Sequence, residues 1–256
     1  MNSKTYSNPH CPKCGGTGQV NIDGKLSGWR ICPCVIVNQR QVSAERILKL
    51  TMPSKALEMT ISSYDTGGLA QNERALSAAR NFVDNYPEAA KNGWMMGLWG
   101  EPRAGKTHLG VGIAQAIAKR YGASPRLINL PKAMNEERER FRHPERSSPL
   151  GEAKLADILV LDDLGAEYYR ETSDGRVSWL TEQLYQLIDE RSMNQRPTIY
   201  TTNLSPSDMK NRYSSEAWKR ILARIEDAQV ASLEVLKTDR KSISESDRAK
   251  ILAPRD

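Results

Sequence analysis

The sequence lacks any run of apolar residues that approaches the roughly 18 residues of a membrane-spanning helix. Its first ten residues, MNSKTYSNPH, are polar, so we expect no secretory signal peptide. Cysteine is missing from residues 35–256, because all four cysteines stand in the first 34 positions. These absences predict a cytoplasmic protein with no membrane contact, in a compartment that keeps thiols reduced.

The composition of the 256 residues is that of a globular protein, with 39% hydrophobic and 27% charged residues. This length suggests one or two domains. The net charge of +6 is unevenly distributed: residues 1–50 hold seven Lys or Arg and two Asp or Glu, whereas residues 147–217 hold seven and twelve. A basic N-terminal end permits a nucleic-acid or acidic-protein partner without establishing one.

All four cysteines lie within one segment, CPKCGGTGQVNIDGKLSGWRICPC, which begins at residue 11. The segment starts with a CxxC pair and ends with a CxC pair. Between them, Asp23-Gly24 stands in an alternating apolar and polar stretch, which predicts a hairpin that brings the pairs together. Four converging sulfurs suit structural zinc, with two disulfides, or His10 as a replacement ligand, as the alternatives. The predicted zinc ligands are Cys11, Cys14, Cys32 and Cys34.

The stretch GEPRAGKTHLG, residues 100–110, has the GxxxxGKT spacing of a phosphate-binding P-loop. It follows an apolar segment, WMMGLW, and precedes apolar residues at helical spacing, as a strand, loop and helix require. A glycine-rich surface turn is the alternative. We expect Lys106 to contact the β- and γ-phosphates of a nucleotide and Thr107 to ligate magnesium. The predicted nucleotide-binding residues of this loop are Gly100, Glu101, Pro102, Arg103, Ala104, Gly105, Lys106, Thr107 and His108.

A second motif, DILVLDDLGAE at 157–167, ends an apolar strand with two carboxylates. Because ligands bind at the carboxyl ends of strands in an open α/β sheet, we expect Asp162 to hold the magnesium shell. Asp163 is expected to polarise the attacking water, with Glu167 as the weaker candidate. A helix N-cap or a turn is the alternative interpretation of these acids.

Two later segments complete the predicted site. RPTIYTTNLSP, residues 196–206, is β-rich and contains Asn203, whose amide can hydrogen-bond the γ-phosphate or the attacking water. SSEAWKRILARIEDA is helical, with Arg220 and Arg224 opposite its apolar face. These arginines can supply charge to a neighbouring subunit's nucleotide, or they are a solvated basic pair. Arg240, further along the chain, is placed to return to the phosphates.

The chain is predicted to hold three segments: a zinc-binding module at 1–52, a flexible linker at 53–68 and an ATPase domain at 69–256. From residue 94 to 240, strands and helices alternate, which is typical of an α/β fold with a parallel sheet covered by helices on both faces. The charged helix PKAMNEERERFRH is either a solvated face or, through its arginines, a DNA contact.

With these motifs the chain resembles the AAA+ helicase loaders of the DnaC/DnaI type. The resemblance is carried by the cysteine segment and by GEPRAGKTHL, VLDDLGAE, YTTN, RILARIEDA and DRK. Where family members often have Asp-Glu in the second motif, this chain has Asp-Asp. The roles that the resemblance implies are Walker A for Lys106 and Thr107, Walker B for Asp162 and Asp163, sensor 1 for Asn203, arginine finger for Arg224 after Arg220, and sensor 2 for Arg240.

The resemblance implies an ATP-dependent loader that places a hexameric, DnaB-type replicative helicase on single-stranded DNA, in a bacterium or a phage. ATP and Mg²⁺ would serve a slow hydrolytic switch, Zn²⁺ would hold the module that binds the helicase, and subunits would associate through the ATP site. The second hypothesis is a transposition helper ATPase of the IstB type, against which the cysteine module argues. The third is a non-hydrolysing zinc adaptor, against which the intact Lys106, Thr107 and Asp162 argue.

Overall fold

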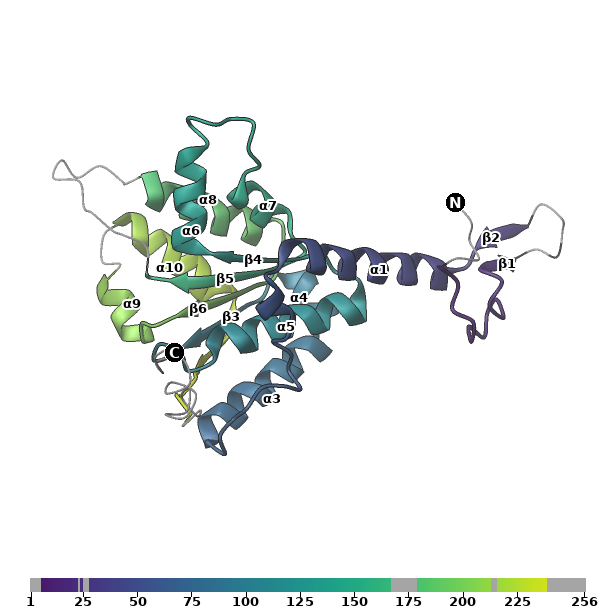
Figure 1. The fold of residues 1–256 in the computed structure, drawn as a ribbon, viewed down its shortest axis with the longest axis horizontal. Coiled ribbons are helices and arrows are strands. Elements are labelled where there is room, and N and C mark those ends of the chain that lie inside the picture. Colours follow the sequence, from purple (N-terminus) through teal and green to yellow (C-terminus); the bar gives the residue numbers. More distant parts are fainter. Residues whose placement is uncertain (1–5, 23, 25–27, 167–178, 213–215, 239–256) are drawn as a thin grey trace, which may run out of the picture.

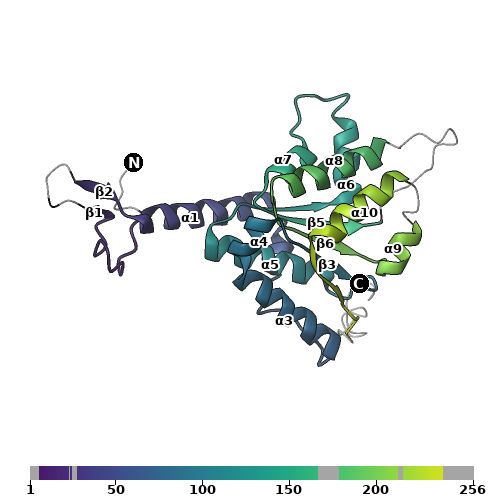
Figure 2. The same cartoon turned by 180° about the vertical axis from the view of Figure 1, so that it is seen from behind.

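The computed structural model of the chain describes residues 6–22, 24, 28–166, 179–212 and 216–238. Figures 1 and 2 show a β-sheet with helices against both of its faces and one long helix that carries a small N-terminal module away from the sheet. No helix in the described part of the chain is both long and apolar enough to cross a membrane.

The central sheet has five parallel strands in the order β4-β5-β6-β3-β7. The middle strands are short and almost fully buried, and β3 and the first four residues of β5 are apolar, as expected for strands that are covered on both faces. The strands are β3 (Met95–Trp99), β4 (Pro125–Asn129), β5 (Ile158–Leu164), β6 (Thr198–Thr202) and β7 (Gln229–Glu234).

Alternate residues of each strand point to two separate apolar cores. Ile158 and Val160 pack with helices α3, α4 and α5, whereas Leu159 and Leu161 pack with helices α6 to α10. The predicted α/β fold, with helices on both faces of a parallel sheet, is therefore confirmed. The helices are α3 (Ala70–Asp84), α4 (Tyr86–Asn92), α5 (Lys106–Tyr121), α6 (Leu130–Glu139), α7 (Pro149–Leu155), α8 (Trp179–Met193), α9 (Pro206–Arg212) and α10 (Glu216–Ala228).

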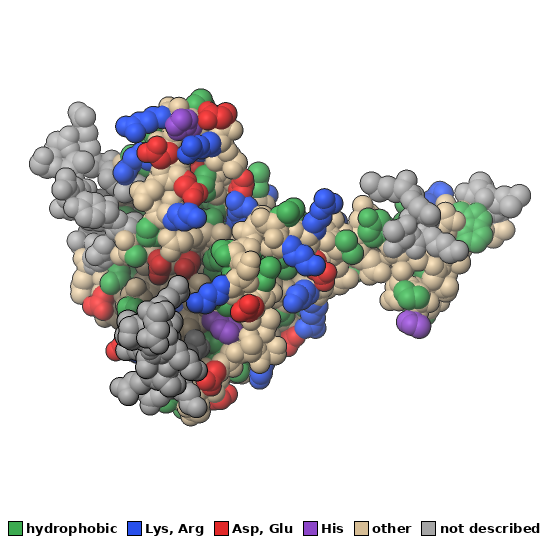
Figure 3. All heavy atoms as spheres, viewed as in Figure 1, with side chains coloured by type: hydrophobic (Ala, Val, Ile, Leu, Met, Phe, Trp, Pro, Cys, Tyr) green, Lys and Arg blue, Asp and Glu red, His purple; other side chains and the backbone are tan. Residues whose placement is uncertain are grey.

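The N-terminal module is a two-stranded antiparallel hairpin of β1 (Gln19–Asn21) and β2 (Trp29–Ile31), followed by α1 (Pro33–Thr51). The predicted hairpin between the cysteine pairs is confirmed. Proline at the first position of α1 suits a helix start, where its missing N–H is not needed. The space-filling view in Figure 3 shows hydrophobic side chains on the surface of this module.

Residues 53–68, predicted as a flexible linker, are packed against α5. Gln115 of α5 donates hydrogen bonds to the backbone carbonyls of Ala56, Leu57 and Met59, at 2.8, 3.3 and 2.8 Å. The structure therefore has a packed connection at this place, while the boundaries of the three predicted segments stay a prediction. The buried apolar side chains shared by α1, α2 (Ser54–Leu57) and α5 are Ala44, Leu48, Met52, Ala56, Val111 and Ala118.

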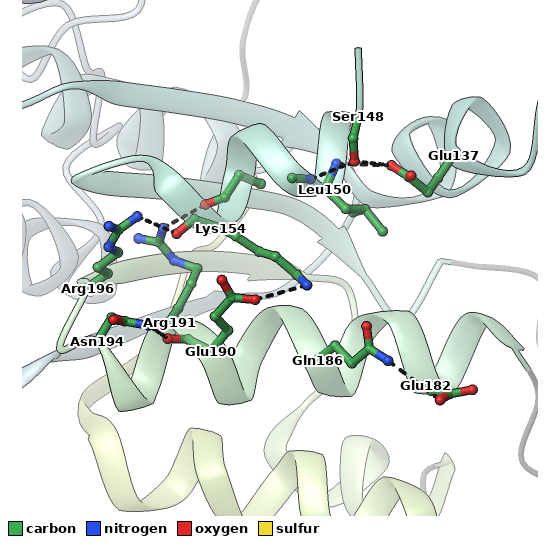
Figure 4. A network of polar contacts seen from close by, with 12 residues as sticks. Glu137, Ser148, Leu150, Lys154, Glu182, Gln186, Glu190, Arg191, Asn194 and Arg196 are labelled. Carbon is green, nitrogen blue, oxygen red and sulfur yellow. Dashed lines mark hydrogen bonds and ion pairs between the residues drawn. The ribbon is translucent and has the colours of Figure 1, made fainter. Parts of the chain in front are cut away.

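Arg191 of α8 is fully buried and joins α7 to the start of β6 (Figure 4). Its guanidinium donates to the carbonyls of Ala153 and Ala156, at 2.7 and 2.8 Å, and to Oγ1 of Thr198, at 2.9 Å. Burial lowers the pKa of Arg191 to about 9, and the charge of Arg196 adds to this shift. These bonds fix the beginning of a strand whose other end reaches the site described below.

Candidate functional site

A cavity of about 810 Å³ lies between the loop before α5 and the segment after α1. Its wall brings together residues of three separate sequence motifs, among them Lys106, Asp163 and Asn203. Asp163 lies near the end of β5, and Asn203 directly follows β6. The cavity therefore lies at the carboxyl end of the sheet, where α/β proteins bind ligands.

The loop that leads into α5 adopts backbone angles that favour glycine. Gly100 and Gly105 have φ values of 138° and 105°. A Cβ on Gly100 would collide with the carbonyl oxygen of Val235, which follows β7. Helix α5 begins at Lys106, so its first backbone N–H groups have no partner within the helix and can bind an anion.

The other predicted residues of this loop occupy different places. Pro102 and Arg103 line the cavity, and Arg103 also has a positive φ, of 67°. Ala104 is buried and belongs to the apolar core beneath the loop. Glu101 is exposed, and it contributes its backbone carbonyl to the lysine contact described next.

Lys106 is held by three oxygen atoms and is 5% exposed. Its Nζ donates to the carbonyls of Gly100 and Glu101, at 2.9 and 2.7 Å, and to Oδ1 of Asn203, at 2.8 Å. Burial lowers the pKa of Lys106, and the carboxylate of Asp163 opposes that shift. The structure thus places the predicted amide beside the predicted phosphate-binding lysine.

Asp162 lies against Thr107, its predicted partner in magnesium binding. The hydroxyl of Thr107 donates to Oδ1 of Asp162 at 2.6 Å, and the hydroxyl of Thr201 donates to the same oxygen at 2.8 Å. Mg²⁺ prefers oxygen ligands and is commonly held by one or two carboxylates together with substrate phosphates. A hydroxyl and a carboxylate this close fit such an ion beside the phosphate loop.

Asp163 points toward a different strand from Asp162. Its φ is 61°, in the left-handed region, at an irregularity in the pairing of β5 with β6. Oδ2 of Asp163 accepts a hydrogen bond from Nδ2 of Asn129 at 2.7 Å. Burial and the charge of Asp162 raise the pKa of Asp163, whereas the Asn129 bond and the charge of Lys106 lower it.

His108 makes its contacts away from the phosphate loop. Its Nε2 lies 3.0 Å from the carbonyl oxygen of Thr60 and 3.2 Å from Oγ of Ser63, and its ring packs edge-on against Tyr64. His108 also lines the cavity, as does Ser63. The sequence motif did not reveal this link between the P-loop helix and the segment after α1.

The predicted arginines are not brought to this cavity within the described chain. Arg224 forms an ion pair with Asp189 of α8, with Nε 2.9 Å from Oδ1, and Arg220 is exposed on the same helix. The role of Arg224 at a neighbouring subunit's nucleotide stays a prediction. Glu167 and Arg240 lie outside the residues that the structure describes.

The four cysteines form a second candidate site. Their sulfurs all lie within 4.8 Å of one another, with 3.7 Å between Cys11 and Cys32 and 3.6 Å between Cys14 and Cys34. Tetrahedral zinc with Zn–S bonds of about 2.3 Å has sulfurs about 3.8 Å apart, so this group fits zinc. Hydrogen bonds from the backbone, first that of Cys14, lower the pKa of Cys11 to about 7. The cysteines are not joined in disulfides, and His10 is exposed outside the group.

The sequence analysis missed two residues of this candidate site, Asn129 and Thr201. Each contacts a predicted acid, and each lies at or near the end of a strand that neighbours β5. A polar residue near the end of an apolar strand was the available signal, but only the strand order shows which acid it meets.

No protein-family model matches the chain. The replicative helicase loader DnaI of Bacillus subtilis (strain 168) is 26% identical over 223 residues, which cover 80% of this chain and 68% of DnaI. A crystal structure of DnaI aligns with a TM-score of 0.60 and 26% identity over 72% of this chain and 95% of the DnaI structure. The crystal structure of the DnaC helicase loader aligns with a TM-score of 0.58 and 25% identity, over 72% of this chain and all of that one.

The chain resembles the DnaC/DnaI-type helicase loaders. The sheet domain has the AAA+ fold that these loaders share, which confirms the predicted fold class. The cysteine group beside this loader-type domain is compatible with the predicted zinc module.

Proposed function

We propose that the chain binds ATP and Mg²⁺ in the cavity and uses the bound nucleotide to load a replicative DNA helicase onto single-stranded DNA. The observation that carries this proposal is the meeting of Lys106, Asp163 and Asn203 around one cavity, with Asp162 bonded to Thr107 of the cavity wall, in a chain similar to helicase loaders. A nucleotide is the ligand that a glycine-rich loop, a buried lysine and two acids suit together.

The contacts of the site support a role for each residue. Lys106 would exchange its bonds to the loop carbonyls for phosphate oxygens, which restores its hydrogen bonds and adds charge pairing. Thr107 and Asp162 would hold the magnesium ion, which neutralises phosphate charge when bound. Asn203, released from Lys106, would then be free to bond the γ-phosphate or the attacking water.

Asp163 would polarise the attacking water as a carboxylate. Its side chain is one methylene shorter than the glutamate that many relatives carry there, which supports slow turnover. A slow ATPase suits a switch between bound and released states better than it suits continuous turnover. The neighbouring subunit would supply Arg224, so that the chain would self-associate through the ATP site.

The N-terminal module is the proposed contact with the hexameric helicase. It stands away from the sheet at the N-terminal end of α1 (Figure 1). The exposed apolar side chains there are Trp29 and Ile31 of β2 and Ile36 and Val37 of α1. Exposed apolar side chains grouped on a small module are typical of a protein interface. Zinc would stabilise this module, since a group of this size has too small a core to fold alone.

An aromatic pair formed by Phe141, which follows α6, and Trp179, which begins α8, supports binding of single-stranded DNA. The ring of Phe141 is 74% exposed and lies 5.6 Å from that of Trp179, centroid to centroid. The guanidinium of Arg138 lies 6.0 Å from the centre of the Trp179 ring. Exposed rings beside arginine are the usual means by which proteins stack unpaired bases without sequence preference.

A capture experiment with the purified helicase of the host tests the proposal. The full chain should retain the helicase and transfer it to circular single-stranded DNA only with ATP. Lys106→Ala should abolish nucleotide binding and loading, whereas Lys119→Ala, at an exposed position of the same helix, should change neither. Retention of a transposase with no binding of the helicase would favour the transposition helper instead.

A further inference from the structure

Thr201 connects the two acids of β5 through one hydroxyl group. It is fully buried in β6, two residues before Asn203. Its Oγ1 donates to Oδ1 of Asp162 at 2.8 Å and accepts the backbone N–H of Asp163 at 3.0 Å. The direction of both bonds is fixed, because an amide N–H can only donate and the single hydroxyl hydrogen must therefore go to the carboxylate.

Packing determines which way this hydroxyl points. The methyl group of Thr201 lies beside Gly110 of α5, where an added Cβ would come within 3.8 Å of it. A β-branched side chain has few rotamers open to it once its methyl is packed. With the methyl group against α5, the hydroxyl is directed to the acids of the neighbouring strand.

The bonds of Thr201 affect the two acids differently. Oδ1 of Asp162 is held from both sides, by Thr201 of β6 and by Thr107 of α5. For Asp163, the bond to the N–H stabilises a left-handed backbone conformation that a residue other than glycine rarely adopts. That conformation separates the two carboxylates, so that Asp163 meets Asn129 and Asp162 meets Thr107.

We propose that Thr201 is the positioning residue of the magnesium site: it holds the carboxylate of Asp162 against Thr107 and fixes the backbone from which Asp163 reaches the cavity. This inference rests on the proposed ATP function. Thr201 itself would touch neither the nucleotide nor the metal and would act through the two acids. Loss of a residue that hydrogen-bonds a metal ligand commonly lowers metal affinity or activity by about 10- to 100-fold.

The test compares variants that differ in the hydroxyl group. Thr201→Val keeps the branched shape and removes the hydroxyl, whereas Thr201→Ser keeps the hydroxyl. The readout is the affinity for a fluorescent ATP analogue, first in EDTA and then during a magnesium titration. For Thr201→Val we expect unchanged affinity in EDTA and about a 10-fold or larger rise in the magnesium concentration at half-saturation. Thr201→Ser should restore the wild-type titration.

Controls separate this effect from general damage to the strand. Thr202→Val changes the next residue, whose hydroxyl accepts the N–H of Leu204, and it should titrate like the wild type. Thermal unfolding reports whether each variant is folded. If Thr201→Val does not fold, Thr201→Ala and Thr201→Ser still differ in the hydroxyl group, and their comparison decides the question.

The outcomes distinguish this inference from the function on which it rests. A wild-type magnesium titration in Thr201→Val, together with a shifted titration in Asp162→Asn, would overturn the role of Thr201 and leave the ATP site intact. Absence of nucleotide binding in the wild type would overturn the proposed function itself, and this inference with it.

Discussion

Arg224 of α10 forms an ion pair with Asp189 of α8 in the same chain, with Nε 2.9 Å from Oδ1. The two side chains are 41% and 30% exposed, so water screens their interaction. Pairs of this kind contribute about 1 kcal/mol or less to stability. Oδ1 of Asp189 is itself buried without a hydrogen-bond partner among the described residues, so Arg224 would leave it only when a more negatively charged phosphate group within reach offsets the loss of this ion pair.

The first prediction concerns this release in an assembly of subunits. Arg224→Ala should lower ATP turnover by roughly 10³-fold if the arginine stabilises phosphate charge in the transition state. Mixing Arg224→Ala chains with Lys106→Ala chains should restore part of the ATPase activity, because the mixed interface joins an intact P-loop to an intact Arg224. Lys219→Ala, at an exposed position of the same helix, is the control, and loss of turnover in Arg220→Ala would assign a role to that arginine as well. If no mixing ratio restores activity, Arg224 does not act on a neighbour's nucleotide.

The second prediction follows from the bond between Asn129 and Asp163. This hydrogen bond lowers the pKa of Asp163 against the opposing effects of burial and Asp162. Asn129→Asp removes the donor and places a second negative charge beside Asp163, and both changes should raise the pKa of Asp163. Since the carboxylate must be ionised to polarise water, the acid limb of the pH profile of ATP hydrolysis should move to higher pH.

Asn129→Asp is preferred to alanine because Oδ1 of Asn129 also caps α6, by accepting the N–H of Lys132 at 3.2 Å. Aspartate keeps that cap, but its second oxygen faces Oδ2 of Asp163, so thermal stability should fall at neutral pH and recover as the pH is lowered. Asn92→Asp, at an exposed asparagine on the other face of the sheet, serves as the control. If the acid limb does not move in Asn129→Asp, ionisation of a group other than Asp163 sets the acid limb of ATP hydrolysis.

The parts of the site that follow one another in sequence could be predicted from it. The P-loop requires glycines at fixed spacing before a helix, so the positions of Lys106 and Thr107 follow from local geometry alone. Asp162 follows from the apolar strand that ends at it. The hairpin between the cysteine pairs was predictable for the same reason, since its turn and its alternating residues are adjacent.

Asn129 and Thr201 could not be predicted, because their roles depend on the order of the strands. The order of the strands, in which β4 and β6 are the neighbours of β5, cannot be derived from the sequence alone. The same holds for the register in which these strands pair. The Ser, Thr and Gly content of residues 53–68 favours a loop, and outside the short helix α2 the segment is one, but composition does not show that it packs against α5. A packed connection forms there because Gly112 leaves room for it: a Cβ would come within 2.9 Å of the backbone nitrogen of Ile61.

The third prediction is one zinc ion per chain, measured by metal analysis of the purified protein. Cys32→Ser should lose the zinc and weaken helicase capture, because the module depends on the metal for its fold. Nucleotide affinity should be unchanged, since the cysteine group and the cavity share no residue. His10→Ala should keep the zinc. Zinc retained in full by Cys32→Ser would show that a different set of ligands binds it.

The fourth prediction concerns the packed connection between α1 and the P-loop helix. Gln115→Leu keeps the approximate size of the side chain but removes the amide that three backbone carbonyls share, of which that of Ala56 still accepts the N–H of Met59. Loss of these bonds should cost about 2 kcal/mol or more. In a chain of this size the midpoint of thermal unfolding should fall by roughly 4–8 °C for that loss. Gln186→Leu, at an exposed position of α8, should leave it nearly unchanged.

The same variant should also weaken nucleotide binding, although Gln115 does not line the cavity. The carbonyls that it holds belong to a segment that supplies Lys55, Met59 and Ser63 to the cavity wall. A nucleotide that contacts this wall binds best when the wall is already ordered, because ordering it on binding uses part of the binding free energy. Titration of an ATP analogue at a temperature where both proteins are folded measures this effect. If the unfolding temperature falls and the affinity is unchanged, Gln115 contributes to stability alone. The connection between α1 and α5 then has no effect on nucleotide binding.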